Sequence, residues 1–181
     1  MARKVRYKAE DIWDLPDDGN TYEVIDGELY VSPGPKFSHQ RAAGRLFIII
    51  GMVVYRDHLG EIVTAPTGVV LDPESGVQPD ILFIRRERAS IISERGVEGA
   101  PDLVVEVLSP STSGRDRGIK MRKYEAAGVP HYWIVDNDRR ALEAYELGPD
   151  GYHLAGTYGP GTVLRSALFP GLDINLDDVW S

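Results

Sequence analysis

The chain has 181 residues, of which 43% are hydrophobic and 27% charged, and it contains no cysteine. These proportions exclude a disordered, collagen-like or membrane-bundle chain, and the lack of cysteine excludes disulfides, thiolate metal sites and a cysteine nucleophile. The 20 basic and 28 acidic residues give a net charge of −8, which argues against binding nucleic acid by overall attraction. The length predicts a single domain over residues 1–181, because two independent cores would be cramped.

The sequence carries no signal for export or for insertion into a membrane. Residues 1–14 are charged throughout and lack the apolar segment of a secretory signal. The longest apolar run, Leu46 to Tyr55, covers about half of the ~20 residues that a membrane crossing needs. We therefore expect a cytoplasmic protein that does not engage a membrane.

The N-terminal half is predicted to combine helices with several short strands. Pro16 ends the first helix, the Asp26-Gly27 pair is typical of a hairpin turn, and Ser38 is a candidate N-cap. Residues 72–76 are expected to form a turn. The expected elements are a helix over 8–15, a hairpin of strands 22–25 and 28–31, a helix from 38 to about 58, and strands over 61–65, 68–71 and 79–84.

The C-terminal half contains two segments that are typical of central strands. Residues 103–108 and 132–135 are almost entirely apolar and rich in β-branched side chains, so both should be buried on both faces. A helix over 116–127, closed by Gly128, connects them. Residues 141–145, 152–157 and 163–164 are expected to form a β-meander at one edge. This order predicts an α/β sandwich with a central mixed sheet and flanking helices.

Two carboxylates on strands are the main candidates for chemistry. Asp80 begins an apolar strand, and Glu106 stands in the middle of another. An unpaired carboxylate in an apolar interior is costly, so it must be paired, protonated or bound to a metal. Two carboxylates on neighbouring strands could hold a hard divalent cation. The alternative is a buried Glu106 that pairs with an arginine such as Arg122, or a Glu106 that faces solvent.

The following helix carries basic groups at helical spacing. Asp116, Lys120, Lys123 and Tyr124 share one face, and this helix returns directly from the strand that contains Glu106. A lysine in this position could orient an attacking water or offset the charge that develops on a phosphodiester. The alternative is a solvated basic face with Tyr124 packed inward.

In combination, these motifs resemble the bacterial Uma-type family described as restriction endonucleases, within the PD-(D/E)xK nuclease superfamily. Singly, each motif is weak, but the likeness covers most of the chain. It is carried by Tyr22 to Leu29, by Pro79-Asp80, by Glu106 within Asp102 to Ser111, by Lys120 and Tyr124 on the helix, and by Gly128 to Asp136. The resemblance implies a restriction-endonuclease-like fold and a metal-dependent endonuclease that hydrolyses DNA phosphodiester bonds.

The resemblance also implies roles for particular residues. Asp80 and Glu106 would be ligands of Mg²⁺ or Mn²⁺, together with the backbone carbonyl of Val107. Leu108 stands where the superfamily pattern places a lysine, which implies that Lys120 on the next helix takes over its role, with Lys123 a weaker candidate. If neither amine reaches the site, the protein would bind DNA or metal without cutting.

Two residues upstream are auxiliary candidates. His39 matches a position where family members often carry histidine, and it could contact a phosphate or support a metal ligand. Its alternative is a helix-terminal histidine satisfied by backbone or water. Glu28 could add an acidic group to the same cleft, and its alternative is a solvent-exposed hairpin residue.

The acidic net charge leaves room for a local basic surface. Arg115, Arg117 and Lys123 are the candidate nucleic-acid contacts, and they could line a groove that attracts DNA. We expect a homodimer, because two copies would double this groove and provide one active site per strand. Two other functions stay open, a catalytically silent nucleic-acid-binding or regulatory module and a dimeric partner-binding protein of the same fold.

Overall fold

The computed structural model describes residues 5–181 and is built around a six-stranded mixed sheet. Strands β8 and β9 run parallel, and the other neighbouring pairs run antiparallel. The order is β11-β10-β9-β8-β6-β3. The bounds are β3 Gly60–Thr64, β6 Ile81–Arg85, β8 Leu103–Val107, β9 His131–Asp136, β10 Ala141–Gly148 and β11 Gly151–Tyr158. The predicted α/β fold with a central mixed sheet is confirmed.

A second sheet of five short strands, in the order β2-β1-β5-β4-β7, was not expected. Its strands are β1 Thr21–Ile25, β2 Glu28–Ser32, β4 Val69–Asp72, β5 Ser75–Val77 and β7 Val97–Glu98. The predicted turn over 72–76 is too wide, since Asp72 already pairs with Ser75 and Gly76 pairs with both Val70 and Val24. The turn is therefore confined to two residues, and the chain after it joins the predicted hairpin to β4.

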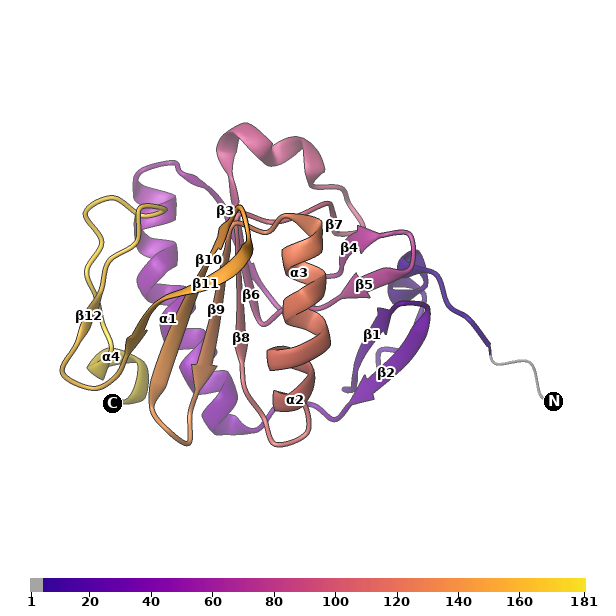
Figure 1. Ribbon diagram of the computed structural model, residues 1–181, viewed down its shortest axis with the longest axis horizontal. Helices are drawn as coiled ribbons and strands as arrows, with labels where there is room; N and C mark the ends of the chain where they lie inside the picture. Colours follow the sequence, from indigo (N-terminus) through magenta and orange to yellow (C-terminus); the bar gives the residue numbers. More distant parts are fainter. Residues whose placement is uncertain (1–4) are drawn as a thin grey trace.

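Helices cover both faces of the six-stranded sheet (Figure 1). Helix α1 lies on one face with the C-terminal segment, and α3 lies on the other face beside the five-stranded sheet. The helical segments are η1 Ala9–Trp13, α1 Phe37–Arg56, η2 Arg86–Ile91, α2 Ser113–Arg115, a π-helical turn Asp116–Lys120, α3 Met121–Ala127 and α4 Asp177–Trp180. Within residues 5–181, no helix is long and apolar enough to cross a bilayer.

Two local predictions are corrected. Ser38 does not cap α1, because the helix already begins at Phe37 and its N-cap residue, Lys36, makes no side-chain cap bond. Val163–Leu164 (β12) does not extend the β9-β10-β11 meander. It pairs instead with β13, Ile174–Asn175, in a separate two-stranded ladder.

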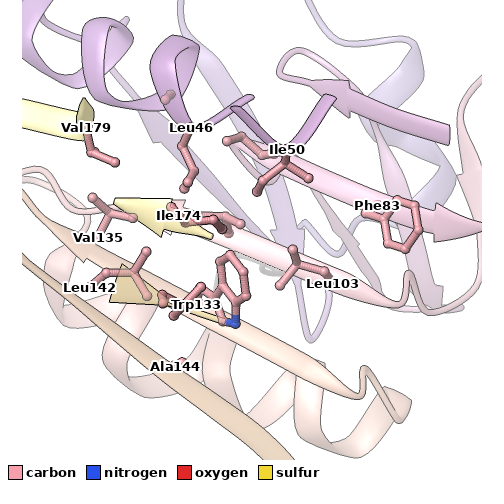
Figure 2. Packing of buried hydrophobic residues seen from close by; sticks show 14 of the residues in the cluster. Leu46, Ile50, Phe83, Leu103, Trp133, Val135, Leu142, Ala144, Ile174 and Val179 are labelled. Carbon is pink, nitrogen blue, oxygen red and sulfur yellow. The ribbon is translucent and has the colours of Figure 1, made fainter. Parts of the chain in front are cut away.

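Alternation along the strands divides the core into two layers. Phe83, Leu103 and Trp133 pack toward α1, where Leu46 and Ile50 cover them (Figure 2). The intervening residues, Leu82, Ile84, Val104, Tyr132 and Ile134, pack on the opposite face with Tyr124 of α3. Because successive side chains of a strand point to opposite faces, Glu106 shares the face of Val104 and is directed toward α3.

Candidate active site

The register of β6 and β8 places the two predicted carboxylates side by side. Ile81 pairs with Val105 and Leu82 with Val104, so the position before Ile81 continues the register to a place opposite Glu106. That position is Asp80. Directly opposite residues of antiparallel strands point to the same face with Cβ atoms about 5 Å apart. The two carboxylates therefore belong to one local site, where β6 begins and β8 ends.

The backbone of β8 fixes the Asp80 side chain. The N–H of Val107 donates a hydrogen bond of 2.7 Å to Asp80 Oδ2. The Asp80 side chain retains 18% exposure, whereas that of Glu106 retains 5%. The site is therefore reached from the Asp80 side, and Glu106 forms its floor.

Lys120 reaches this floor from the helix. Its Nζ lies 2.7 Å from Glu106 Oε1, 2.7 Å from Glu23 Oε1 and 3.6 Å from Asp116 Oδ1. The π-helical turn Asp116–Lys120 widens the helix at this point and turns both Asp116 and Lys120 inward. The helix lysine thus converges with the strand carboxylate, and the buried Glu106 pairs with Lys120 rather than with the exposed Arg122.

Three buried carboxylates surround this one ammonium group. Burial raises the pKa of Glu106 well above its usual range, although the Lys120 charge partly offsets the effect, and burial also raises the pKa of Asp116. Burial lowers the pKa of Lys120, but the charges of Glu106 and Glu23 outweigh it and hold that pKa well above normal. Three carboxylates buried beside one ammonium group therefore favour the uptake of further positive charge, either a proton or a cation.

Hydrogen bonds from tyrosines hold the floor and the helix in place. The Tyr124 hydroxyl donates to Glu106 Oε1 at 2.7 Å, and the Tyr132 hydroxyl donates to the Asp116 carbonyl oxygen at 2.9 Å. Asp116 Oδ1 is buried and finds no hydrogen-bond partner within residues 5–181. This buried oxygen, without a hydrogen-bond donor, is an acceptor that a proton or a cation could satisfy.

His39 contacts the more open side of the site. Its Nε2 lies 3.2 Å from Asp80 Oδ2, while its buried Nδ1 has no hydrogen-bond partner in the described part of the chain. Burial lowers the pKa of His39, but the hydrogen bond and charge of Asp80 more than compensate, so the pKa is raised. The predicted auxiliary histidine therefore lies against the predicted metal ligand.

Glu23 is a site residue that the sequence interpretation missed. It lies on β1, only 4% exposed, and it accepts a hydrogen bond of 3.1 Å from the Gln78 N–H besides its contact with Lys120. The sequence signal for Glu23 was its spacing of two residues from the apolar Ile25, which places both side chains on the same buried face of β1. Glu28, the acidic residue singled out from the sequence, is exposed at the turn end of the hairpin.

The three predicted DNA contacts are engaged with other residues. The Arg115 guanidinium bonds the Ser32 hydroxyl and lies 5.2 Å from the centre of the Tyr30 ring. The Arg117 guanidinium forms a two-pronged pair with Glu143 at 2.5 and 3.0 Å. Lys123 pairs with Asp26 and lies 3.5 Å from Asp72. Binding of nucleic acid by these three residues stays a prediction. It requires each side chain to leave its present partner for a phosphate, or to contact a phosphate while keeping that partner.

Cavities of residues 5–181 lie near segments that carry site residues, although Asp80, Glu106 and Lys120 do not line them. The larger, of about 780 Å³, lies where η1, β1 and β7 meet β3 and β6, and we call it the junction cavity; it is lined by Trp13, Tyr22, Gln78, Leu82, Ile84 and Val97, among others. A smaller cavity, of about 360 Å³, is lined by residues that follow β8, including Leu108 and Ser109, and by Arg117.

The donor groups at the site fit a hard divalent cation. Asp80 and Glu106 supply carboxylate oxygens, the ligands that Mg²⁺ and Mn²⁺ prefer, and a cation could replace the protons that burial favours on the carboxylates. Within residues 5–181, no three His, Asp or Glu side chains are grouped to hold an ion by themselves. Mg²⁺ commonly binds one or two protein carboxylates and completes its shell with water and substrate phosphate. The residues suit that kind of site.

Comparison with known proteins places this chain in a family. The family model described as "Putative restriction endonuclease" (Uma2) matches residues 9–177, nearly the whole sequence. The chain belongs to the Uma2 family. The predicted resemblance is therefore confirmed. No curated protein matches the chain.

A solved structure shares the fold of this Uma2 protein. It comes from Anabaena variabilis and is described as a "putative nuclease belonging to DUF820". The TM-score is 0.77 at 18% sequence identity, over 96% of this chain and 97% of that chain. At this identity the likeness establishes the fold, which confirms the predicted restriction-endonuclease-like architecture.

Proposed function

We propose that this Uma2 protein is a metal-dependent endonuclease that hydrolyses DNA phosphodiester bonds. The observation that carries the proposal is the convergence of Asp80, Glu106 and Lys120, which come from two neighbouring strands and the following helix. The family description supports nuclease activity, and the extent of its match supports one domain over the chain.

Each residue of the site has a distinct proposed task. Asp80 and Glu106, with the Val107 carbonyl, would hold Mg²⁺ or Mn²⁺, which supplies a water of lowered pKa and polarises the scissile phosphate. The Lys120 ammonium would offset the negative charge that develops on the phosphate oxygens. Glu23 anchors Lys120 through its 2.7 Å contact, so it acts as a positioning residue.

The residues around Asp80 prepare it for these tasks. The Val107 N–H and His39 Nε2 both contact Asp80 Oδ2, and the second carboxylate oxygen of Asp80 is the donor that we propose for the metal. Two neighbours on one oxygen restrict rotation of the side chain, and a restricted ligand loses less entropy on binding. His39 is therefore proposed to orient Asp80 rather than to react.

Cleavage of a supercoiled plasmid with Mg²⁺ or Mn²⁺ tests the proposal. We expect Asp80→Asn, Glu106→Gln and Lys120→Met each to lower the rate at least 100-fold, while Asp150→Asn in the β10–β11 turn leaves it unchanged. Cleavage that survives Asp80→Asn or Glu106→Gln would refute the assigned metal site. If the wild type binds DNA but never cuts it, the silent nucleic-acid-binding function replaces the nuclease.

Contact with DNA is tested through its salt dependence. We propose that Arg115, Arg117 and Lys123 bind phosphates, in which case the logarithm of affinity should fall linearly with the logarithm of salt concentration. Removing one phosphate contact should lower that slope by about 1. A slope unchanged in all three alanine variants would exclude them from the interface.

We also propose that the protein is a homodimer assembled through the outer face of α1. Phe37, Ile48, Met52 and Tyr55 recur at helical spacing and are 80, 60, 69 and 84% exposed. Contiguous exposed apolar surface is typical of an interaction site. A Cβ added at Gly44 would meet nothing within 4 Å, so a second backbone could approach this face closely. A second copy is the proposed occupant because two-fold symmetry would supply one active site for each DNA strand.

A further inference from the structure

The junction cavity has the properties of a binding site for a small organic group. Its volume of about 780 Å³ lies within the range of about 300 to 1,000 Å³ that is common for ligand pockets. Leu82, Ile84 and Val97 provide apolar walls, and Tyr22 and Gln78 add groups that can hydrogen-bond. Apolar walls with a few polar groups are the usual composition of a specific pocket.

The aromatic wall of this cavity is held in place by its neighbours. The Arg95 guanidinium carbon lies 4.8 Å from the centre of the Trp13 ring, and Arg95 is tied to Asp14 at 3.2 Å. A Cβ at Gly68 would lie 2.5 Å from Trp13 Nε1, and one at Gly96 would lie 3.0 Å from it. Only glycine leaves room for the indole at Gly68, and the ring is thereby fixed in one position.

The charges around the cavity select against an anion. Asp17, Glu61 and Glu94 line it together with Arg95, and the Arg95 guanidinium is paired with Asp14 at 3.2 Å. A phosphate placed inside would meet carboxylates without a free cation, which is unfavourable in a partly desolvated site. A planar, uncharged ring with hydrogen-bonding edges suits these walls better.

Two segments are common to the junction cavity and the candidate active site. Gln78 lines the cavity while its N–H bonds Glu23, and it precedes Asp80 by two residues. Tyr22 lines the cavity and is adjacent to Glu23 in β1. Leu82 lies two residues beyond Asp80, about 7 Å along the strand at about 3.4 Å per residue. This span is comparable to that between the phosphate and the base of one nucleotide.

We propose that the junction cavity receives a single nucleobase turned out of the DNA, while a phosphate of the same strand lies at Asp80. This inference rests on the proposed nuclease function and adds a means of reading the substrate. Enzymes that inspect a base in this way extract it from the stack and bind it through stacking and edge hydrogen bonds. Trp13 and the aliphatic walls would provide the contact surface, and Gln78 would contact the base edge.

Binding of free deoxynucleosides to the intact protein, without divalent metal, tests the inference directly. In heteronuclear NMR spectra, the indole N–H resonance of Trp13, assigned by Trp13→Phe, should shift saturably with at least one deoxynucleoside. The resonances of Trp133 and Trp180 serve as internal references, because neither residue lines the cavity. Adding a 5′-phosphate to the nucleoside should not strengthen binding.

Matched variants locate the binding. Ala89 is an exposed residue of η2 that lines the cavity, so Ala89→Trp should fill it and weaken binding at least tenfold. Ala155→Trp, on the exposed surface of β11 and outside the lining, should bind like the wild type. Equal weakening in both variants would overturn the assignment to this cavity.

The outcomes separate this inference from the nuclease itself. Plasmid cleavage by a protein that binds no nucleoside would refute the base pocket and leave the nuclease intact. Nucleoside binding by a protein that cuts no DNA would support the pocket and refute the proposed reaction. Equal binding of benzyl alcohol would refute the specificity for a nucleobase. Tighter binding of the 5′-phosphate form without divalent metal would refute the selection against anions by the cavity.

Discussion

Replacing Lys120 by methionine should destabilise the protein strongly, because it leaves three carboxylates buried without their cation. Glu23, Glu106 and Asp116 are at most 4% exposed, and Lys120 contacts two of them at 2.7 Å. Removing one partner of a buried ion pair costs about 3–5 kcal/mol. In a chain of this size each kcal/mol lowers the melting temperature by about 2–4 °C, so Lys120→Met should melt about 6–20 °C below the wild type.

The same variant should show a defined pH dependence. Without Lys120, the pKa of Glu106 rises further above its unfolded value, so the folded state takes up a proton more readily than the unfolded state. The destabilisation should then grow as the pH rises from about 5 to 8, and shrink toward acid. Thermal unfolding followed by circular dichroism at several pH values measures both effects.

Two further variants isolate the cause. Glu23→Gln combined with Lys120→Met should recover part of the lost stability, because one fewer carboxylate is left unbalanced. Lys36→Met, at an exposed lysine, should stay within about 0.5 kcal/mol of the wild type. A Lys120→Met protein that melts with the wild type at pH 8 would refute the account of a buried ammonium holding these carboxylates.

Three other predictions concern the buried hydroxyl, a histidine and the dimer. Tyr124→Phe removes the 2.7 Å bond to Glu106 and should lower the urea unfolding free energy by about 1–3 kcal/mol; no change would contradict that bond. Burial lowers the pKa of His131 below its usual 6.5, so the unfolded state takes up the proton first. Below about pH 6.5 the wild type should therefore lose stability relative to His131→Gln, and parallel pH profiles would contradict this. Met52→Lys should halve the mass measured by light scattering, whereas Leu154→Lys, also at an exposed apolar residue, should not; an unchanged mass for Met52→Lys would exclude the α1 face.

The parts of the fold predicted correctly are those whose side-chain pattern is decided locally. The apolar strand at 103–108 and the strand at 132–135 could be assigned because burial on both faces leaves few polar positions. Short edge strands have no such pattern. The strand Ser75–Val77 was missed because its first two residues, a serine and a glycine, are typical of turns and fell within the predicted turn over 72–76. The pairing of β12 with β13 depends on contacts far along the chain, which local patterns do not contain.

The candidate site was predicted as far as its residues lie in recognisable motifs. Asp80, Glu106 and Lys120 carried the resemblance, and the structure brings Glu106 and Lys120 into contact. Glu23 was missed in favour of Glu28 because both lie in one hairpin, and only the packing of that hairpin against the helix reveals which carboxylate turns inward. A pattern read along one segment identifies candidate groups, whereas their partners are set by tertiary packing.

The wide turn at Asp116–Lys120 makes the position of the lysine sensitive to chain length. An α-helical residue advances the helix by about 100°, so deleting one residue from this turn would restore regular winding and rotate every side chain before it relative to α3. Met121 to Ala127 could keep their packing, while the residues before the deletion would be rotated about the helix axis and would no longer face Glu106. Single-residue deletions in this segment could thus abolish the proposed hydrolysis without replacing any of the acidic residues or the lysine itself.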